Sequence, residues 1–226
     1  MIDQYYLLLV VPALLISLFA QFKVKSTFSK YSQEYNSKGL TGAAAASLLL
    51  RANDITDVRI EPVSGELTDN YNPTSKVLHL SEPVLSKTTI AAVGVAAHET
   101  GHAIQHARGY GPLALRSMLV PVANIGSSFG PTMAIAGLVL GFGPIIDIGI
   151  ILYACAVLFY IVTLPVEFNA SSRALVILRE TNSMTEEELK KVKKVLSAAA
   201  MTYVASALTA IASLLRLVLL SRNRRR

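Results

Sequence analysis

Residues 88–107 read TTIAAVGVAAHETGHAIQHA and predict one long helix, around which the rest of the fold can be arranged. Alanine is the strongest helix former, and Gly109 follows as a plausible C-cap. The helix is apolar and uncharged except near its middle, where His98, Glu99 and His102 occur together. Placing such groups in an apolar run is costly unless they have partners, so they call for a chemical role.

The histidines of this helix are spaced to hold one metal ion. His98 and His102 lie four residues apart, so their side chains project from the same face, and imidazole is a common zinc ligand. Glu99 is offset by about 100° around the helix, which places its carboxylate beside the metal as an acceptor for a proton of bound water. The pattern predicts one zinc ion per chain, with Glu99 as general base. A polar helix face that merely contains two histidines is the alternative.

A catalytic zinc ion usually has three protein ligands, so a third must come from elsewhere. His106 lies about 12 Å along the helix from His98, too far to share the ion, and suits a helix-end cation better. His79 falls in a predicted strand, where a surface or core role is expected. Glu167 is the better candidate, because an apolar hairpin returns the chain there to the side on which the 88–107 helix ends. The alternative for Glu167 is an interfacial carboxylate at a helix start.

The composition indicates an integral membrane protein. Apolar residues make up 52% of the 226 residues and charged residues only 16%, which argues against a soluble globule and against disorder. Cys155 is the only cysteine, so a disulfide scaffold is excluded. The net charge of +6 comes from residues that border apolar segments rather than forming a nucleic-acid patch, so no nucleic-acid partner is expected. Four apolar blocks approach or reach the length of a membrane span: 2–22, 117–140, 145–164 and 198–220.

Lysines and arginines set the expected orientation. Three lysines directly follow the first block, which places the N-terminus outside and the next segment in the cytoplasm. The second and third blocks are joined by a Gly/Pro turn at 141–144 and predict a helical hairpin with both ends on the cytoplasmic side. Three glycines in the first arm allow close helix packing; they are Gly126, Gly130 and Gly137.

The last apolar block is ambiguous. Its length suits a fourth crossing, but it contains Arg216 and is followed by an arginine-rich end at 222–226. A crossing would place this basic end outside, against the positive-inside rule. Lying at the interface, or re-entering from the cytoplasmic side, are the alternatives.

The polar regions predict short helices and a small β-hairpin or meander. Residues 40–52 predict a helix with Thr41 as N-cap, and 167–179 predict another. Thr185 and Glu188 form a capping box at the start of a charged helix. Alternating strands are expected at 58–63 and 76–81, with turns at Gly65 and 70–73 between them. The second strand is either an edge that pairs with an extended peptide or an ordinary internal strand.

A second motif completes a family resemblance. Residues 167–174, EFNASSRA, look like the second motif of zinc peptidases whose third ligand is a glutamate. With HETGH at 98–102, the chain resembles the YugP-type neutral zinc metallopeptidases over nearly its whole length, and more distantly HtpX-like and CAAX prenyl proteases. The resemblance implies a mainly α integral membrane protein with a gluzincin-like catalytic part beside transmembrane helices. It implies zinc ligands at His98, His102 and Glu167 and a general base at Glu99.

One position departs from the HtpX-like pattern, which usually has an aspartate four residues beyond the glutamate. Ser171 stands there in this chain. Orientation of a ligand histidine would then fall to Asn169, Ser171 or a backbone carbonyl. The group that stabilises the oxyanion stays open among four residues: Tyr71, His79, Tyr110 and Arg173.

These observations favour a multi-pass cell-membrane zinc endopeptidase whose site faces the cytoplasm and whose partners are a polypeptide substrate and the lipid bilayer. A non-catalytic membrane scaffold with a structural or degenerate metal site is the alternative, although such a site has no use for Glu99. A transporter is disfavoured, because the spans hold few ionisable residues. The expected segments are an anchor at 1–22, a catalytic part at 23–116, a transmembrane hairpin at 117–164, helices with the third ligand at 165–197 and an apolar helix with a basic tail at 198–226.

Overall fold

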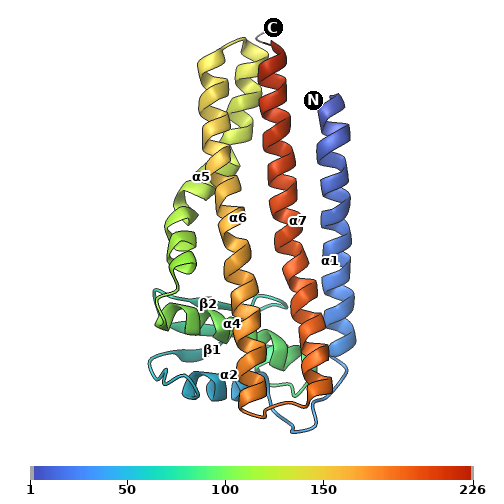
Figure 1. The fold of residues 1–226 in the computed structure, drawn as a ribbon, viewed down its shortest axis with the longest axis vertical. Coiled ribbons are helices and arrows are strands. Elements are labelled where there is room, and N and C mark those ends of the chain that lie inside the picture. Colours follow the sequence, from blue (N-terminus) through green and yellow to red (C-terminus); the bar gives the residue numbers. More distant parts are fainter. Residues whose placement is uncertain (1–2, 225–226) are drawn as a thin grey trace. The chain divides into compact units, whose positions relative to one another are not determined.

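The computed structural model describes residues 3–224, and the chain forms two compact units. The first, here called the apolar unit, contains Met1–Gln21, Ala114–Pro165 and Met201–Arg226. The second, here called the polar unit, contains Phe22–Leu113 and Val166–Ala200. Figure 1 follows the chain through its elements, and four long helices contribute residues to both units.

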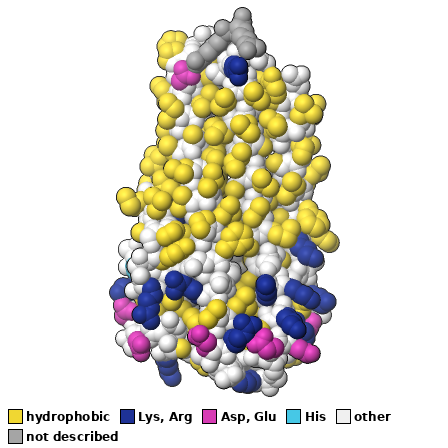
Figure 2. Space-filling model, in the orientation of Figure 1, with side chains coloured by type: hydrophobic (Ala, Val, Ile, Leu, Met, Phe, Trp, Pro, Cys, Tyr) yellow, Lys and Arg dark blue, Asp and Glu magenta, His cyan; other side chains and the backbone are white. Residues whose placement is uncertain are grey.

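Long apolar helices build the apolar unit, and four helices of the described residues are long and apolar enough to cross a membrane. Exposed leucine, isoleucine, valine and phenylalanine side chains are frequent on them, as expected for surfaces that face lipid. On the face drawn in Figure 2, hydrophobic side chains predominate on this unit and most charged side chains lie on the polar unit. The prediction of a mainly α membrane protein is confirmed. The elements are η1 (Tyr6–Val10), α1 (Val11–Tyr31), α5 (Gly111–Leu140), α6 (Gly143–Glu180) and α7 (Glu186–Arg224).

Glycines let α5 and α6 pack with their backbones in contact, as the sequence predicts. A Cβ atom at Gly126 would lie 2.2 Å from the Leu152 carbonyl oxygen. From the opposite helix, a Cβ atom at Gly149 would lie 2.5 Å from the Ala134 nitrogen. Such proximity is available only to residues without a side chain, so the helical hairpin depends on these glycines.

Two helices are longer than the sequence suggests. Separate elements at 145–164 and 167–179 were expected, but α6 continues through Pro165 without a break. Proline removes one helix hydrogen bond, and helices of membrane proteins tolerate this because neighbouring groups satisfy the freed carbonyl. Likewise α7 joins the charged segment after the Thr185 cap to the apolar block at 198–220.

Two arginines near the end of α7, Arg216 and Arg224, have partners within the apolar unit. Arg216 binds the Asp3 carboxylate, with Nη2 at 2.6 Å and Nε at 2.9 Å from Oδ2. Its guanidinium also lies 5.2 Å from the centre of the Tyr6 ring. Arg224 donates to the carbonyl oxygens of Gly137 and Leu138 at the end of α5. Pairing of this kind lowers the cost of placing an ionisable group in an apolar helix, which makes α7 compatible with a span.

The polar unit surrounds a three-stranded sheet with the order β1-β3-β2. The central strand β3 pairs with β1 in parallel and with β2 in antiparallel fashion. The hairpin is therefore formed by β2 and β3, and residues 70–72, expected to be part of a turn, are a strand. Strand β3 is internal rather than an edge, and its burial on both faces agrees with this place. The strands are β1 (Arg59–Val63), β2 (Asn70–Asn72) and β3 (Val77–Ser81).

Predicted helix caps in the polar unit are confirmed. The Thr41 hydroxyl accepts a hydrogen bond from the Ala44 amide at 3.1 Å. In the capping box, Glu188 N donates to Thr185 Oγ1 and Thr185 N donates to Glu188 Oε2. Gly109, with φ of +61°, lies just beyond the helix that carries the HETGH motif and has the left-handed conformation that favours glycine. The helices confined to this unit are α2 (Gly42–Arg51), α3 (Glu82–Leu85) and α4 (Ile90–Ala107).

Candidate metal centre

Helix α4 presents both motif histidines from one face. Its N-cap, Thr89, accepts a hydrogen bond from the Ala92 amide, and its apolar residues are almost all buried. The rings of His98 and His102 lie edge to face, with centroids 4.9 Å apart. The helical spacing read from the sequence therefore brings the two imidazoles together.

Helix α6 reaches this face because Gly101 has no side chain. A Cβ atom at Gly101 would lie 2.5 Å from the Ala170 carbonyl oxygen of α6, far inside van der Waals contact. The backbones of α4 and α6 thus touch at Gly101 and Ala170. His98 and His102 lie on the α4 side of this contact, and Glu167 and Ser171 lie on the α6 side. This glycine sets the distance at which the second motif meets the first.

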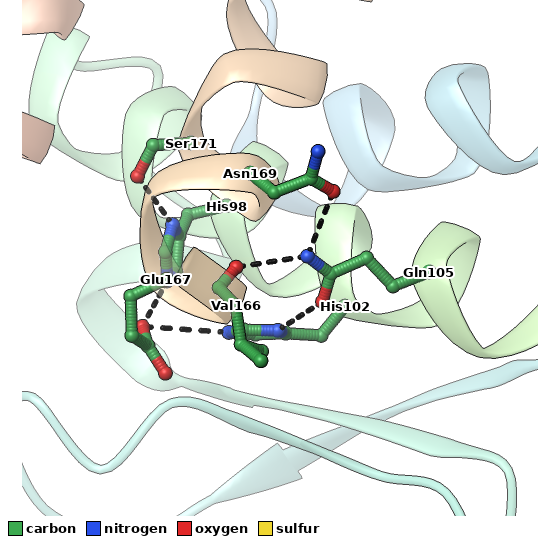
Figure 3. A network of polar contacts seen from close by, with 7 residues as sticks. All are labelled: His98, His102, Gln105, Val166, Glu167, Asn169 and Ser171. Atoms are coloured by element: carbon green, nitrogen blue, oxygen red, sulfur yellow. Dashed lines mark hydrogen bonds and ion pairs between the residues drawn. The ribbon is translucent and has the colours of Figure 1, made fainter. Parts of the chain in front are cut away.

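Glu167 is buried, with 2% of its surface exposed, and points at both histidines (Figure 3). Its Oε2 atom lies 3.2 Å from His98 Nε2 and 3.6 Å from His102 Nε2. One ligand atom from each of the three residues lies within 4.8 Å of the others. Tetrahedral zinc with bonds of 2.0–2.1 Å separates its ligand atoms by about 3.3 Å, so the two histidine-to-glutamate distances suit such an ion.

The far nitrogen of each histidine ring is also engaged. His98 Nδ1 lies 3.0 Å from Ser171 Oγ, and His102 Nδ1 lies 3.0 Å from Gln105 Oε1. Both Nε2 atoms are consequently turned toward Glu167, as Figure 3 shows. A metal-bound histidine characteristically uses one nitrogen for the metal and the other for a hydrogen bond. This donor set, two imidazoles and one carboxylate with oriented rings, fits zinc.

Gln105 is the residue of this network that the sequence reasoning missed. It is fully buried and donates from Nε2 to Val166 O at 2.8 Å and to Asn169 Oδ1 at 3.0 Å. Asn169, which was considered as a direct partner of a histidine, acts through Gln105 instead. The sequence does carry a signal, since Gln105 follows His102 by three residues and so lies next to it on the helix.

Glu99 lies half-buried beside the three ligand candidates. Burial raises the pKa of its carboxyl group, the Glu167 carboxylate adds to the increase, and the neighbouring His98 and His102 oppose it. A carboxylate with a raised pKa is a better proton acceptor near neutral pH than an exposed one. Its place next to His98 on α4 leaves it available for acid–base chemistry.

The four oxyanion candidates have other contacts. The Tyr71 hydroxyl and His106 Nδ1 form a hydrogen bond of 2.8 Å. This contact gives His106, which is not part of the candidate ligand cluster, a partner of its own. His79 Nδ1 lies 3.2 Å from Asn70 Oδ1 on the neighbouring strand. The two remaining candidates lie together, with the Arg173 guanidinium 5.8 Å from the centre of the Tyr110 ring.

Comparison with known proteins agrees with the site. Residues 6–222 match the model of a family described as "Putative neutral zinc metallopeptidase". The chain is 49% identical over 220 residues to the "Putative membrane protease YugP" of Bacillus subtilis (strain 168), covering 97% of this chain and 98% of the relative. No solved structure matches it. Because both matches extend over nearly the whole sequence, the chain belongs to this neutral zinc metallopeptidase family.

Proposed function

We propose that this protein is a membrane-bound zinc endopeptidase in which His98, His102 and Glu167 hold one zinc ion and Glu99 is the general base. The observation that carries the proposal is the meeting of three ligand atoms from α4 and α6 within 4.8 Å. The four residues involved come from two motifs that are 69 residues apart at His98 and Glu167. Membership of a family described as zinc metallopeptidases supports it.

The chemistry is hydrolysis of a peptide bond. Zinc, when bound, supplies a Lewis acid that polarises the scissile carbonyl and makes water acidic. Glu99 accepts a proton from the attacking water, whose oxygen adds to the carbonyl carbon. Glu99 then gives this proton to the leaving amine as the carbon–nitrogen bond breaks. The raised pKa of Glu99 suits both transfers, because the group must first take up a proton and then release it.

A polypeptide substrate is supported by the relative, whose name describes a membrane protease. Strand β2 is one of the two edge strands of the sheet, and it is the one whose Tyr71 side chain contacts α4 through His106. Such an edge offers backbone groups to an extended peptide. We therefore propose that the substrate segment binds in extended form along β2.

A multi-pass arrangement with the site at the cytoplasmic face is also part of the proposal. Four long apolar helices support it, as do the basic residues that follow α1's apolar part and flank the hairpin. These charges belong on the cytoplasmic side by the positive-inside rule. They are Lys23, Lys25, Lys30, Arg108, Arg116, Arg173 and Arg179.

Bound zinc and proteolysis of unfolded casein, measured on detergent-purified protein, test the proposal. Wild type should bind about one zinc per chain, and His98→Ala and Glu167→Gln should each lose it. Glu99→Gln should retain the zinc and lose casein cleavage, since only the proton acceptor is removed. Glu180→Gln, at the exposed end of the same helix as Glu167, is the matched control and should keep both.

Three results would contradict parts of this proposal. Stoichiometric zinc in both His98→Ala and Glu167→Gln would place the metal elsewhere. Zinc in wild type together with casein cleavage that is unaffected by Glu99→Gln would remove Glu99 from the chemistry. Bound zinc without any cleavage would favour a scaffold with a structural metal site.

A further inference from the structure

We propose that Gln105 is a positioning residue that fixes the protonation pattern of His102, and that Asn169 and Arg173 hold it in place. This inference rests on the proposed zinc site and adds three residues to it. The contacts form one chain, from Arg173 to Asn169, from Gln105 to Asn169, and from His102 to Gln105. Figure 3 shows the part of this chain between Asn169 and His102.

The orientation of the Gln105 amide follows from its neighbour Val166. A backbone carbonyl oxygen only accepts hydrogen bonds, so the Gln105 atom that lies 2.8 Å from Val166 O must be the nitrogen. The amide oxygen then faces His102 Nδ1 at 3.0 Å. An amide oxygen only accepts, so His102 Nδ1 must carry the proton. In the neutral ring the lone pair of His102 is then left on Nε2, which is the atom turned toward Glu167.

Asn169 and Arg173 prevent the amide from reversing. Asn169 Oδ1 accepts from Gln105 Nε2 at 3.0 Å and from Arg173 Nε at 2.7 Å. Guanidinium has donors and no acceptor, so the Asn169 atom facing it must be oxygen. The chain of contacts therefore ends at the Arg173 guanidinium, a group that can only donate hydrogen bonds.

The other histidine is held differently. His98 Nδ1 lies 3.0 Å from a hydroxyl, that of Ser171, and a hydroxyl donates or accepts with equal ease. The Ser171 contact orients the ring of His98 without selecting which nitrogen is protonated. Of the two histidines in this cluster, only His102 therefore has a buried amide that selects the tautomer with Nε2 free to bind a metal.

The first test is zinc affinity of detergent-purified full-length protein, measured by competition with a chromophoric chelator. Gln105→Leu keeps the volume and removes the acceptor, so zinc binding should weaken about 10- to 100-fold. Thr100→Val is the matched control, because Thr100 is equally buried on α4 but bonds its own helix at Ala96 O. Its affinity should equal that of wild type, and thermal unfolding checks that both variants fold.

The second test separates positioning from simple electrostatics by the sign of the effect. Removing a positive charge near a cation site should tighten zinc binding. Arg173→Met should instead weaken it about 3- to 10-fold, because an unheld Asn169 can reverse, which turns its amide nitrogen toward Gln105 Nε2 and loosens the Gln105 amide that faces His102. Asn169→Asp has oxygen on both sides and cannot reverse, so in that background Arg173→Met should no longer weaken zinc binding.

The outcomes are distinguishable from failure of the proposed function. Wild-type zinc affinity in folded Gln105→Leu would overturn the positioning role and leave the three-ligand site intact. Tighter zinc binding in Arg173→Met with Asn169 present would also overturn it, since electrostatics alone would then account for Arg173. Absence of zinc from wild type after reconstitution would overturn both proposals together.

Discussion

Helix α6 makes close backbone contacts in both units, and the two contacts are organised differently. In the apolar unit, α5 and α6 approach through several glycines along the hairpin, among them Gly126 and Gly149. In the polar unit, the contact of α6 with α4 is made at one glycine, Gly101, opposite Ala170. The first contact packs helices, and the second places Glu167 against two histidines.

The difference shows that a glycine, which lacks a side chain, can either let two helices pack closely or set the distance between the residues of a chemical site. Contacts spread over several turns lose a fraction of their stability when one glycine is replaced. A contact that fixes ligand distances is sensitive to a few tenths of an ångström, because ligand bonds to zinc vary little in length. We therefore expect substitutions in the apolar unit to affect stability and those at the α4–α6 contact to affect zinc.

The largest effect is expected from Gly101→Ala. Its methyl group would lie 2.5 Å from the Ala170 carbonyl oxygen, so α4 and α6 must separate and Glu167 must leave the histidines. Zinc affinity should fall by about 100-fold or more, measured by chelator competition. Gly94→Ala on the same helix is the control, because the nearest atom to its methyl group would be Val192 Cγ1 at 3.2 Å, a side-chain atom rather than a backbone atom. Wild-type affinity in Gly101→Ala would contradict the contrast between the two contacts.

Arg216→Met should give the largest effect in the apolar unit. It leaves the Asp3 carboxylate, whose side chain is 16% exposed, without its guanidinium partner. Loss of one member of this largely buried pair should cost roughly 3 kcal/mol of unfolding free energy, measured by denaturation in detergent. Addition of Asp3→Asn should restore most of this stability. Zinc stoichiometry should stay at the wild-type value in both variants. A fall in zinc stoichiometry would show that zinc binding depends on the Asp3–Arg216 pair of the apolar unit.

Gly126→Ala should have a smaller effect, again without loss of zinc. The added methyl group would lie 2.2 Å from the Leu152 carbonyl oxygen, but the other glycines of the hairpin remain. Overpacking of this kind costs about 1–3 kcal/mol of unfolding free energy. Denaturation in detergent measures the loss, with Gly143→Ala, which meets no atom within 4 Å, as control. Equal stability of these two variants would show that the hairpin does not depend on close approach.

The smallest effect is the pH dependence of two aspartates in the polar unit. Burial raises the pKa of Asp69, although it accepts hydrogen bonds from Ser81. The folded chain then holds this proton at a pH where the unfolded chain has lost it, so its stabilising contribution is present below the ordinary pKa. That contribution is lost as the pH rises through the folded pKa. Asp69→Asn should remove this fall in unfolding free energy.

Asp57 supplies a control of opposite sign for the Asp69 experiment. Its partner Lys76 lowers the pKa of Asp57, so its contribution is present above the ordinary pKa and is lost as the pH falls through the folded pKa. Denaturant unfolding of Asp69→Asn and Asp57→Asn between pH 3 and 7 measures both slopes. Slopes of the same sign would refute the assignment for one of the two groups.

Much of the architecture follows from local patterns in the chain. Thr41 and the Thr185–Glu188 box mark helix starts, and Gly109 marks the end of α4. These positions could be predicted because capping involves only neighbouring residues. The parallel pairing of β1 with β3 was not predictable, since it joins strands that are separated by another strand. The continuity of α6 through Pro165 was also missed, because local rules read proline as a boundary.

What the sequence determined by itself about the candidate site is which residues are its candidate donors. The HETGH spacing places His98 and His102 on one helix face, and Glu167 could be proposed because the hairpin returns the chain to the same side. Helix periodicity and span length are local quantities, so they can be read without coordinates.

Only the tertiary structure decided how these donors are held. Three features join residues about 60–75 positions apart: the approach of α6 to Gly101, the Ser171 contact, and the chain through Gln105 and Asn169. In the apolar unit, the pairing of Asp3 with Arg216 joins the two ends of the described chain. Contacts of this kind depend on how helices pack in space, and a single sequence records no distance between residues that are remote along it.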